Sequence, residues 1–316
     1  MLDKKHRLNI ADEQLDGCTL CGNLCGTDRR AGGISICGAG PTAEVSHVEI
    51  HHGEEPPLSG TNGCGNIFFH NCSLSCVYCQ NWQISIEDAV AKQSYTASQL
   101  ADEMLRLQEA GVHTLGLVAP TSHIPTLVPA LYRARGMGLY IPVVYNSGGF
   151  DTVSGLRLLD GLIDIYLPDM KYGTDEVAQV YSGVVDYVAT NRLAVEEMLR
   201  QVGPLTLDRE GIARRGLLIR HLILPGGMAD TIDVISWIAR YMPREVPLSL
   251  MSQYAPKYQA AEGFFPEIER KLTQGEYDYY LAVADELGLT NIYSQDLESA
   301  LVYAPDFTRE HPFETR

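Results

Sequence analysis

Apolar and polar residues follow two alternating spacings along most of the chain after residue 64. Short apolar runs predict strands, and the stretches between them, with apolar residues every three or four positions, predict helices. The predicted strands cover residues 67–69, 114–118, 139–145, 162–167, 216–224 and 246–251. The predicted helices cover residues 98–107, 124–136, 152–160, 174–202 and 229–241. This alternation predicts an α/β fold in which parallel strands and their helices form a partial or complete (βα) TIM-like barrel.

The ends of the chain differ from this middle part and set the predicted domain boundaries. Residues 1–62 are expected to form a small cysteine-rich metal-binding lobe and linker, residues 63–300 the barrel, and residues 301–316 a C-terminal tail. The lobe has too few large apolar residues for a core of its own, so a metal is expected to replace the core. Alternation over 44–50 predicts an exposed strand that leads into the barrel. The segment from residue 276 to 294 is expected to cover the barrel edge.

Composition narrows the class of protein. The chain has 316 residues, 45% of them hydrophobic, and no apolar run near the roughly 18 residues that a membrane helix requires. Its formal charge of -16, from 40 acidic and 24 basic residues, would repel a phosphate backbone. We therefore expect a soluble protein without membrane or nucleic-acid partners. Thiols in metal-like spacings, with no export signal at the start, predict a reducing cytoplasm and anaerobic chemistry.

All eight cysteines lie within the first 79 residues, and Cys72, Cys76 and Cys79 form a CxxxCxxC motif. A disulfide framework is excluded because such frameworks belong to short secreted chains. Structural zinc remains the rival, but it usually takes four ligands in two pairs. Three thiolates on one short loop are typical of a [4Fe-4S] cluster whose fourth iron has no protein ligand. In radical enzymes S-adenosylmethionine binds that iron and is reductively cleaved.

A second group of thiols, Cys18, Cys21, Cys25 and Cys37, lies within 20 residues in a glycine-rich segment. Four thiols close a coordination shell, so this group predicts a structural zinc site or an auxiliary [4Fe-4S] cluster. The spacing does not decide between the two, and free buried thiols are the alternative. Cys64 stands apart and is expected to be a small buried residue.

Polar residues follow several of the predicted strands. Asn146 follows the third strand, Asp169 and Lys171 follow the fourth, and Arg220 and His221 lie in the fifth. In (βα) barrels the site forms at the carboxyl ends of the strands. We therefore expect these residues to line a ligand groove beside the CxxxCxxC motif.

Residues 63–82 resemble the cluster loop of radical SAM enzymes related to pyruvate formate-lyase activating enzyme. More narrowly, the chain resembles the PflX-like branch, which also has a Cys-x-Leu-Cys lobe like residues 18–21 and a linker like residues 52–60. The resemblance runs over nearly the whole chain and includes residues 169–171, 220–226 and 249–256. It implies a radical SAM barrel.

The resemblance also implies roles for individual residues. The three CxxxCxxC cysteines would hold the cluster, and Tyr78 would pack near the adenine of S-adenosylmethionine. Asp169 and Lys171 would contact its ribose or methionine portion, and Arg220 a carboxylate or ribose edge.

The chain departs from the family after the second strand. Activating enzymes carry a Gly-Gly-Glu segment there that receives the methionine amino group, whereas this chain reads Ala-Pro-Thr-Ser-His over 119–123. Thr121 and Ser122 are the oxygen acceptors that remain in this segment.

Together these features predict a radical SAM oxidoreductase that generates a 5'-deoxyadenosyl radical and abstracts hydrogen from a substrate. The resemblance favours a glycine of a partner protein as substrate and a flavodoxin- or ferredoxin-like reductant. Another peptide or a small metabolite would use the same groove. A different class, an iron-sulfur or zinc scaffold or electron carrier without radical chemistry, is disfavoured because it needs no groove of polar strand-end residues.

Overall fold

The computed structural model describes residues 3–87, 89–297 and 305–313. Its largest sheet has eight strands in the order β3-β1-β2-β4-β5-β6-β8-β7, and a second sheet has the order β11-β10-β9. The strands are β1 (Ala43–His51), β2 (Cys64–Phe69), β3 (Gln93–Tyr95), β4 (Thr114–Val118), β5 (Val143–Ser147), β6 (Ile165–Pro168), β7 (Thr206–Leu207), β8 (Ala213–Leu217), β9 (Ile219–Leu222), β10 (Leu248–Met251) and β11 (Ile292–Ser294). The helices are α1 (Lys4–Glu13), α2 (Pro56–Ser59), α3 (Trp82–Ser85), α4 (Ala97–Glu109), α5 (Ile124–Gly136), α6 (Val153–Arg157), α7 (Asp175–Ser182), α8 (Tyr187–Val202), α9 (Thr231–Tyr241) and α10 (Gln274–Glu286).

The two sheets together form an open barrel. Strands β2, β4, β5, β6 and β8 pair in parallel, as do β9, β10 and β11. A parallel bridge between Asp169 and Arg220 carries the pairing from the end of β6 to β9. Among the described residues no ladder joins β11 to β2, so the barrel is not closed. The predicted α/β barrel is therefore confirmed in its partial form.

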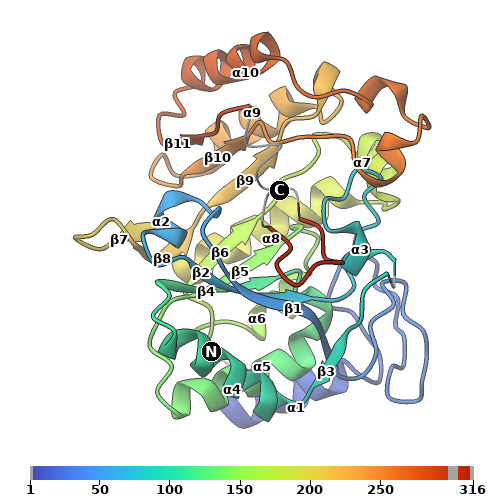
Figure 1. The fold of residues 1–316 in the computed structure, drawn as a ribbon, viewed down its shortest axis with the longest axis vertical. Coiled ribbons are helices and arrows are strands. Elements are labelled where there is room, and N and C mark those ends of the chain that lie inside the picture. Colours follow the sequence, from blue (N-terminus) through green and yellow to red (C-terminus); the bar gives the residue numbers. More distant parts are fainter. Residues whose placement is uncertain (1–2, 88, 298–304, 314–316) are drawn as a thin grey trace.

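Helices cover the outside of this barrel (Figure 1). In the view of Figure 1, α1, α4 and α5 lie below the large sheet, while α9 and α10 lie at the opposite end beside β10 and β11. Helix α4 shows why such segments are helical, since its apolar residues Leu100, Met104 and Leu107 recur on one buried face. Its N-cap is Thr96, in a capping box with Gln99. The helix predicted over 98–107 therefore starts one residue earlier, at Ala97.

Two predicted elements are each divided in the structure. The helix predicted over 174–202 is two helices, α7 and α8, because α7 ends at Gly183 in the left-handed conformation (φ 66°). The strand predicted over 216–224 is β8 and β9 with Leu218 between them. The strand breaks where its pairing changes, since β8 pairs with β6 and β9 pairs with β10.

The chain ends also contribute to the sheets. The strand predicted over 44–50 is β1, which is mostly half-buried rather than exposed because it pairs antiparallel with β2 and β3. Residues 292–294 do more than cover the edge, since they form β11 and pair with β10.

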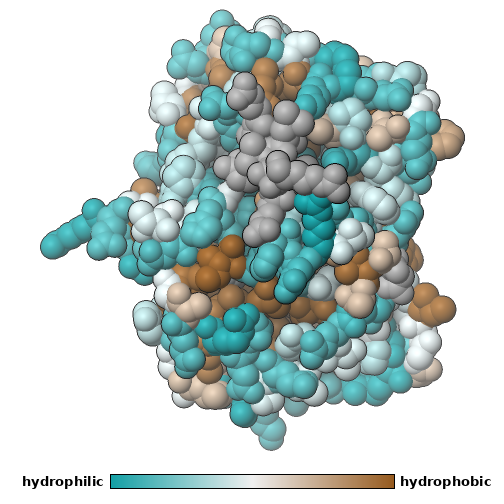
Figure 2. All heavy atoms as spheres, viewed as in Figure 1, coloured by the Kyte–Doolittle hydropathy of each residue, from teal (hydrophilic) through white to brown (hydrophobic). Residues whose placement is uncertain are grey.

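The surface is largely hydrophilic in the view of Figure 2. None of the described helices is both long and apolar enough to span a bilayer.

A short segment of the predicted linker fills the barrel at its amino-terminal end. Leu58, in α2, is fully buried in one cluster with Val144 and Ile165, near the amino ends of β5 and β6. Thr114, the first residue of β4, donates its hydroxyl to the Leu58 carbonyl at 2.8 Å. Because this end is packed with apolar side chains, we expect a ligand to enter from the opposite, carboxyl end of the strands.

Candidate functional site

The loop that follows β2 carries Cys72, Cys76 and Cys79 at the carboxyl edge of the barrel. Cys76 is buried and the other two are half-buried. Hydroxyl groups contact two of the sulfurs: Ser182 Oγ lies 2.9 Å from Cys76 Sγ, and Ser85 Oγ lies 3.1 Å from Cys79 Sγ. Helix α7, through its last residue Ser182, therefore holds this loop against the barrel wall.

Lys171 supplies positive charge near these thiols. Its ammonium group forms an ion pair with Asp169 at 2.5 Å and interacts electrostatically with Cys76. Burial opposes the charge of Lys171, but Asp169 together with Cys76 and two nearby tyrosines outweighs burial and holds the lysine pKa well above its usual value. Burial, reinforced by Cys76, raises the pKa of Cys79 to about 11. A bound metal would keep such thiols deprotonated, and Lys171 would then face a group of thiolates.

A pocket with a cavity volume of about 190 Å³ opens beside the cysteine loop. The pocket is lined by Cys76, Tyr78, Cys79, Gln80, Asn81, Val118, Asn146, Asp169, Lys171, Arg220, Leu222, Met251 and Gln253. Two thiols of the loop and the polar residues that follow the third, fourth and fifth predicted strands thus share one cavity.

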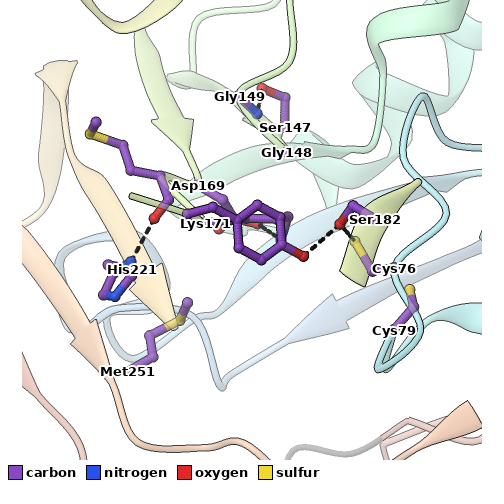
Figure 3. A network of polar contacts seen from close by, with 12 residues as sticks. Cys76, Cys79, Ser147, Gly148, Gly149, Asp169, Lys171, Ser182, His221 and Met251 are labelled. Atoms are coloured by element: carbon purple, nitrogen blue, oxygen red, sulfur yellow. Dashed lines mark hydrogen bonds and ion pairs between the residues drawn. The ribbon is translucent and has the colours of Figure 1, made fainter. Parts of the chain in front are cut away.

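Figure 3 shows Asp169 and Lys171 between His221 on one side and Ser182 and Cys76 on the other. The segment after β6 that contains them is held by residues that do not line the pocket. Asn191 donates to the carbonyl oxygens of Gly149 and Asp169 at 3.0 and 2.9 Å, and the Tyr187 hydroxyl accepts from the Lys171 backbone N–H at 2.9 Å. On the other wall, the hydroxyls of Tyr78 and Tyr172 lie 2.7 Å apart. Helix α8, which carries Tyr187 and Asn191, therefore orients the Asp169–Lys171 pair toward the cysteines.

Arg220 lines the pocket but is already bound to two carboxylates. Its guanidinium contacts Glu55 at 2.6 Å and Glu54 at 2.5 Å, and Asn66 donates to Glu54 at 2.7 Å. Two carboxylates share one guanidinium, so the three side chains together carry net negative charge. Sequence reasoning missed both glutamates, although they lie in the linker that resembles the PflX-like branch.

A second, smaller pocket adjoins the first and shares Arg220, Asn146 and Gln253 with it. Glu54 and His51 line it together with Pro305 and Phe313 of the C-terminal segment. The remaining lining residues are Gly53, Phe68, Gln80, Asn81, Val118 and Gln295. Side-chain carboxamides dominate its polar surface.

Thr121 and Ser122 do not line either pocket. Thr121 donates to Asp151 at 2.8 Å, and Ser122 Oγ lies 3.2 Å from Cys37 Sγ. Both residues lie in a short 3-10 helix, residues 121–123, whose three residues are buried. The structure therefore separates these two predicted cofactor contacts from the other strand-end residues.

His221 also points away from the pocket. It is fully buried, with Nδ1 2.6 Å from the Met170 carbonyl oxygen and Nε2 2.9 Å from Thr231 Oγ1. A carbonyl only accepts, so Nδ1 carries the proton of a neutral ring. Burial lowers the pKa of His221 to about 4.

This shift predicts a pH dependence of stability. Between pH 6.5 and about 4 the unfolded chain protonates this imidazole while the folded chain does not, so stability falls as the pH falls through that window. His221→Gln removes this contribution, and its unfolding free energy should fall less steeply, by up to about 1.4 kcal/mol per pH unit. Urea unfolding at several pH values measures both slopes, and equal slopes would contradict the buried neutral imidazole.

The four cysteines of the N-terminal lobe lie close together. Cys18 interacts electrostatically with Cys25 and Cys37, and Cys21 interacts in the same way with Cys37 and Cys18. Within the described ranges no three His, Cys, Asp or Glu side chains converge as ligands of a single ion. The lobe also contacts the other cysteine loop, since Asn23 donates to the Ser73 carbonyl at 2.8 Å.

Comparison with known proteins addresses the fold. No family model matches the chain. The chain is 29% identical over 302 residues to the uncharacterised protein MJ0674 of Methanocaldococcus jannaschii, covering 93% of this chain and 81% of that protein. SuiB of Streptococcus suis, in its structure bound to S-adenosylmethionine, aligns over 73% of this chain with a TM-score of 0.50 and 13% identity. The FeFe-hydrogenase maturase HydG of Carboxydothermus hydrogenoformans aligns over 71% with a TM-score of 0.45 and 16% identity.

The likeness to SuiB decides the architecture. The barrel has the partial, TIM-like fold of SuiB. The chain spans about half the length of SuiB and of HydG. In this fold the CxxxCxxC loop follows the first parallel strand of the barrel, β2, and the larger of the two pockets opens next to it.

Proposed function

We propose that the protein is a radical SAM enzyme that cleaves S-adenosylmethionine reductively and abstracts hydrogen from a substrate. The observation that carries the proposal is the shared cavity, in which Cys76 and Cys79 line the same pocket as Asn146, Asp169 and Lys171. Neither an electron carrier nor a zinc scaffold needs a pocket of polar side chains beside its metal ligands. The radical SAM fold supports the same assignment.

The donor set fits a [4Fe-4S] cluster. Three thiols of one loop supply three iron ligands and leave one iron open, and Lys171 offsets part of the thiolate charge. When bound, the cluster supplies one electron to S-adenosylmethionine, whose carbon–sulfur bond then breaks to give methionine and a 5'-deoxyadenosyl radical that takes hydrogen from the substrate.

The polar residues of the pocket would hold S-adenosylmethionine. The carboxylate of Asp169 suits the ribose hydroxyls, Lys171 suits the methionine carboxylate, and Tyr78 offers an aromatic wall for adenine. Thr121 and Ser122 face the lobe, so the amino group must find its acceptors elsewhere. The Asn146 and Gln253 side chains supply oxygen acceptors within the pocket.

Apolar residues of the same pocket would protect the radical. Val118, Leu222 and Met251, at the ends of β4, β9 and β10, line it. Leu58 and the apolar cluster around it pack the amino-terminal end of the barrel. Water then has access only through the mouth, where bound substrate would exclude it.

The adjoining pocket is the proposed substrate site. Its carboxamides both donate and accept hydrogen bonds, as peptide groups do, and Glu54 and Glu55 give it net negative charge around Arg220. These features favour a polypeptide segment, such as a glycine of a partner protein, over an anionic metabolite. The resemblance to the PflX-like branch and to activating enzymes supports the same substrate class, with a flavodoxin- or ferredoxin-like protein as reductant.

Binding of S-adenosylmethionine tests the proposal without turnover. Anaerobically reconstituted wild type should bind about one S-adenosylmethionine per chain in equilibrium dialysis, whereas Cys76→Ala should bind it at least tenfold more weakly, because the open iron is lost. Cys64→Ala is the matched control, since Cys64 is buried at the start of β2 outside both pockets. Equal binding by wild type and Cys76→Ala would contradict the proposed site.

A further inference from the structure

Arg29, in the N-terminal lobe, is buried with no anionic partner among the described residues. Its side chain is among the largest that are fully buried, with 1% of the residue exposed. Its Nη1 donates to the Ser122 carbonyl at 2.7 Å, but its Nε and Nη2 have no hydrogen-bond partner among the described residues. No ion pair links it to a described carboxylate. Burying a charged group in this way is costly unless an anion compensates it.

Two of the four thiols of the lobe, Cys18 and Cys37, lie near Arg29. The charge of Arg29 acts on Cys18, and Ser122, whose carbonyl binds Arg29, places its hydroxyl 3.2 Å from Cys37 Sγ. Asp151 forms an isolated β-bridge with Cys21. Its buried carboxylate accepts hydrogen bonds from three hydroxyls instead of binding a cation. The missing anion therefore lies on the side of the cysteines.

From this arrangement we infer that Cys18, Cys21, Cys25 and Cys37 bind a metal–thiolate centre of net negative charge, and that Arg29 is its buried counter-charge. A zinc ion with four thiolates and a [4Fe-4S] cluster with four thiolates are both anionic. On binding, the four thiols release their protons to solvent and the sulfurs become metal ligands. Arg29 is a positioning residue, because it acts on the centre through charge and not as a ligand.

The centre also has a structural consequence for the neighbouring loop. Asn23, between Cys21 and Cys25, donates to the carbonyl of Ser73, next to Cys72. Gly38, next to Cys37, packs so closely on Asn71 that a Cβ would lie 2.9 Å from its side-chain oxygen. A lobe with its metal centre bound would thus fix the start of the CxxxCxxC loop. The inference itself does not depend on S-adenosylmethionine chemistry.

Metal content tests the site directly. In a variant with Cys72, Cys76 and Cys79 all replaced by alanine, the lobe is the remaining thiol cluster. Purified anaerobically as the whole chain, this variant should retain either one zinc or about four iron atoms per chain, which elemental analysis distinguishes. Adding Cys64→Ala should change nothing. A folded variant, with native circular dichroism but without stoichiometric metal, would overturn the inference.

The role of Arg29 is tested by the rate of metal release from the same variant, in which Cys72, Cys76 and Cys79 are alanine. Arg29→Met should release metal to a chelator, EDTA for zinc or bathophenanthroline for iron, about 10- to 100-fold faster, whereas Arg29→Lys should retain most of the slow rate. A merely structural Arg29 would leave the release rate of Arg29→Met unchanged, and that result would refute its role.

A second measurement covers the case in which Arg29→Met does not fold. Stripping the metal from the variant that retains Arg29 should lower its melting temperature, because the guanidinium then lacks its anion. An unchanged melting temperature after complete metal removal would contradict the counter-charge.

Discussion

Replacing Arg220 with methionine is expected to lower the free energy of unfolding by about 3–5 kcal/mol. The guanidinium, Glu54 and Glu55 are 14%, 11% and 3% exposed, so the three charges lie largely out of water. Removing Arg220 leaves two carboxylates beside each other without a cation inside the barrel. Urea unfolding at pH 7 measures the loss.

Two controls separate lost charge balance from lost packing. The triple variant Arg220→Met, Glu54→Gln and Glu55→Gln should recover part of the stability, because no uncompensated charge remains. Arg214→Met removes a solvent-exposed ion pair with Asp208 and should cost far less. A loss for Arg220→Met no larger than that for Arg214→Met would show that the buried triad does not stabilise the barrel.

Replacing Lys171 with methionine is expected to lower the reduction potential of the bound cluster by on the order of 100 mV. Lys171 interacts with Cys72, Cys76 and Cys79, and a nearby cation stabilises the reduced, more negative state. One unit charge several ångströms away contributes about 2–3 kcal/mol at an effective dielectric constant near 20. Redox titration followed by electron paramagnetic resonance measures the potential.

The ion-pair partner supplies a control of opposite sign. Asp169→Asn removes a negative charge beside Lys171 and should raise the potential, while Lys171→Arg should leave it nearly unchanged. If Lys171→Met and Asp169→Asn shifted the reduction potential in the same direction, the charges of this ion pair would not explain the potential of the cluster.

Local features of the chain predicted the centre of the site. The CxxxCxxC spacing lies within eight residues, and Asp169 and Lys171 directly follow a strand, so the parallel sheet alone brings them to one edge. The same reasoning predicted most strands, because buried parallel strands are continuous apolar runs. It failed at breaks such as Leu218, where only the change of pairing partner ends the strand.

Long-range contacts explain what local features missed. Glu54 and Glu55 contact Arg220 across 165 or more residues, and nothing in the linker sequence shows that α2 inserts into the barrel. Thr121 and Ser122 follow a barrel strand as expected, but their hydroxyls contact Asp151 and Cys37 outside the pocket. Arg29 belongs to no recognisable sequence motif, and only its burial in the structure indicates its role.

The most direct test of radical chemistry is the product of S-adenosylmethionine cleavage. The anaerobically reconstituted and reduced protein is incubated with S-adenosylmethionine, and 5'-deoxyadenosine and methionine are quantified for wild type, Cys76→Ala and Cys64→Ala. We expect both products in equal amounts from wild type and Cys64→Ala, and neither from Cys76→Ala. Absence of 5'-deoxyadenosine from wild type with a fully loaded, reduced cluster would contradict the proposed function.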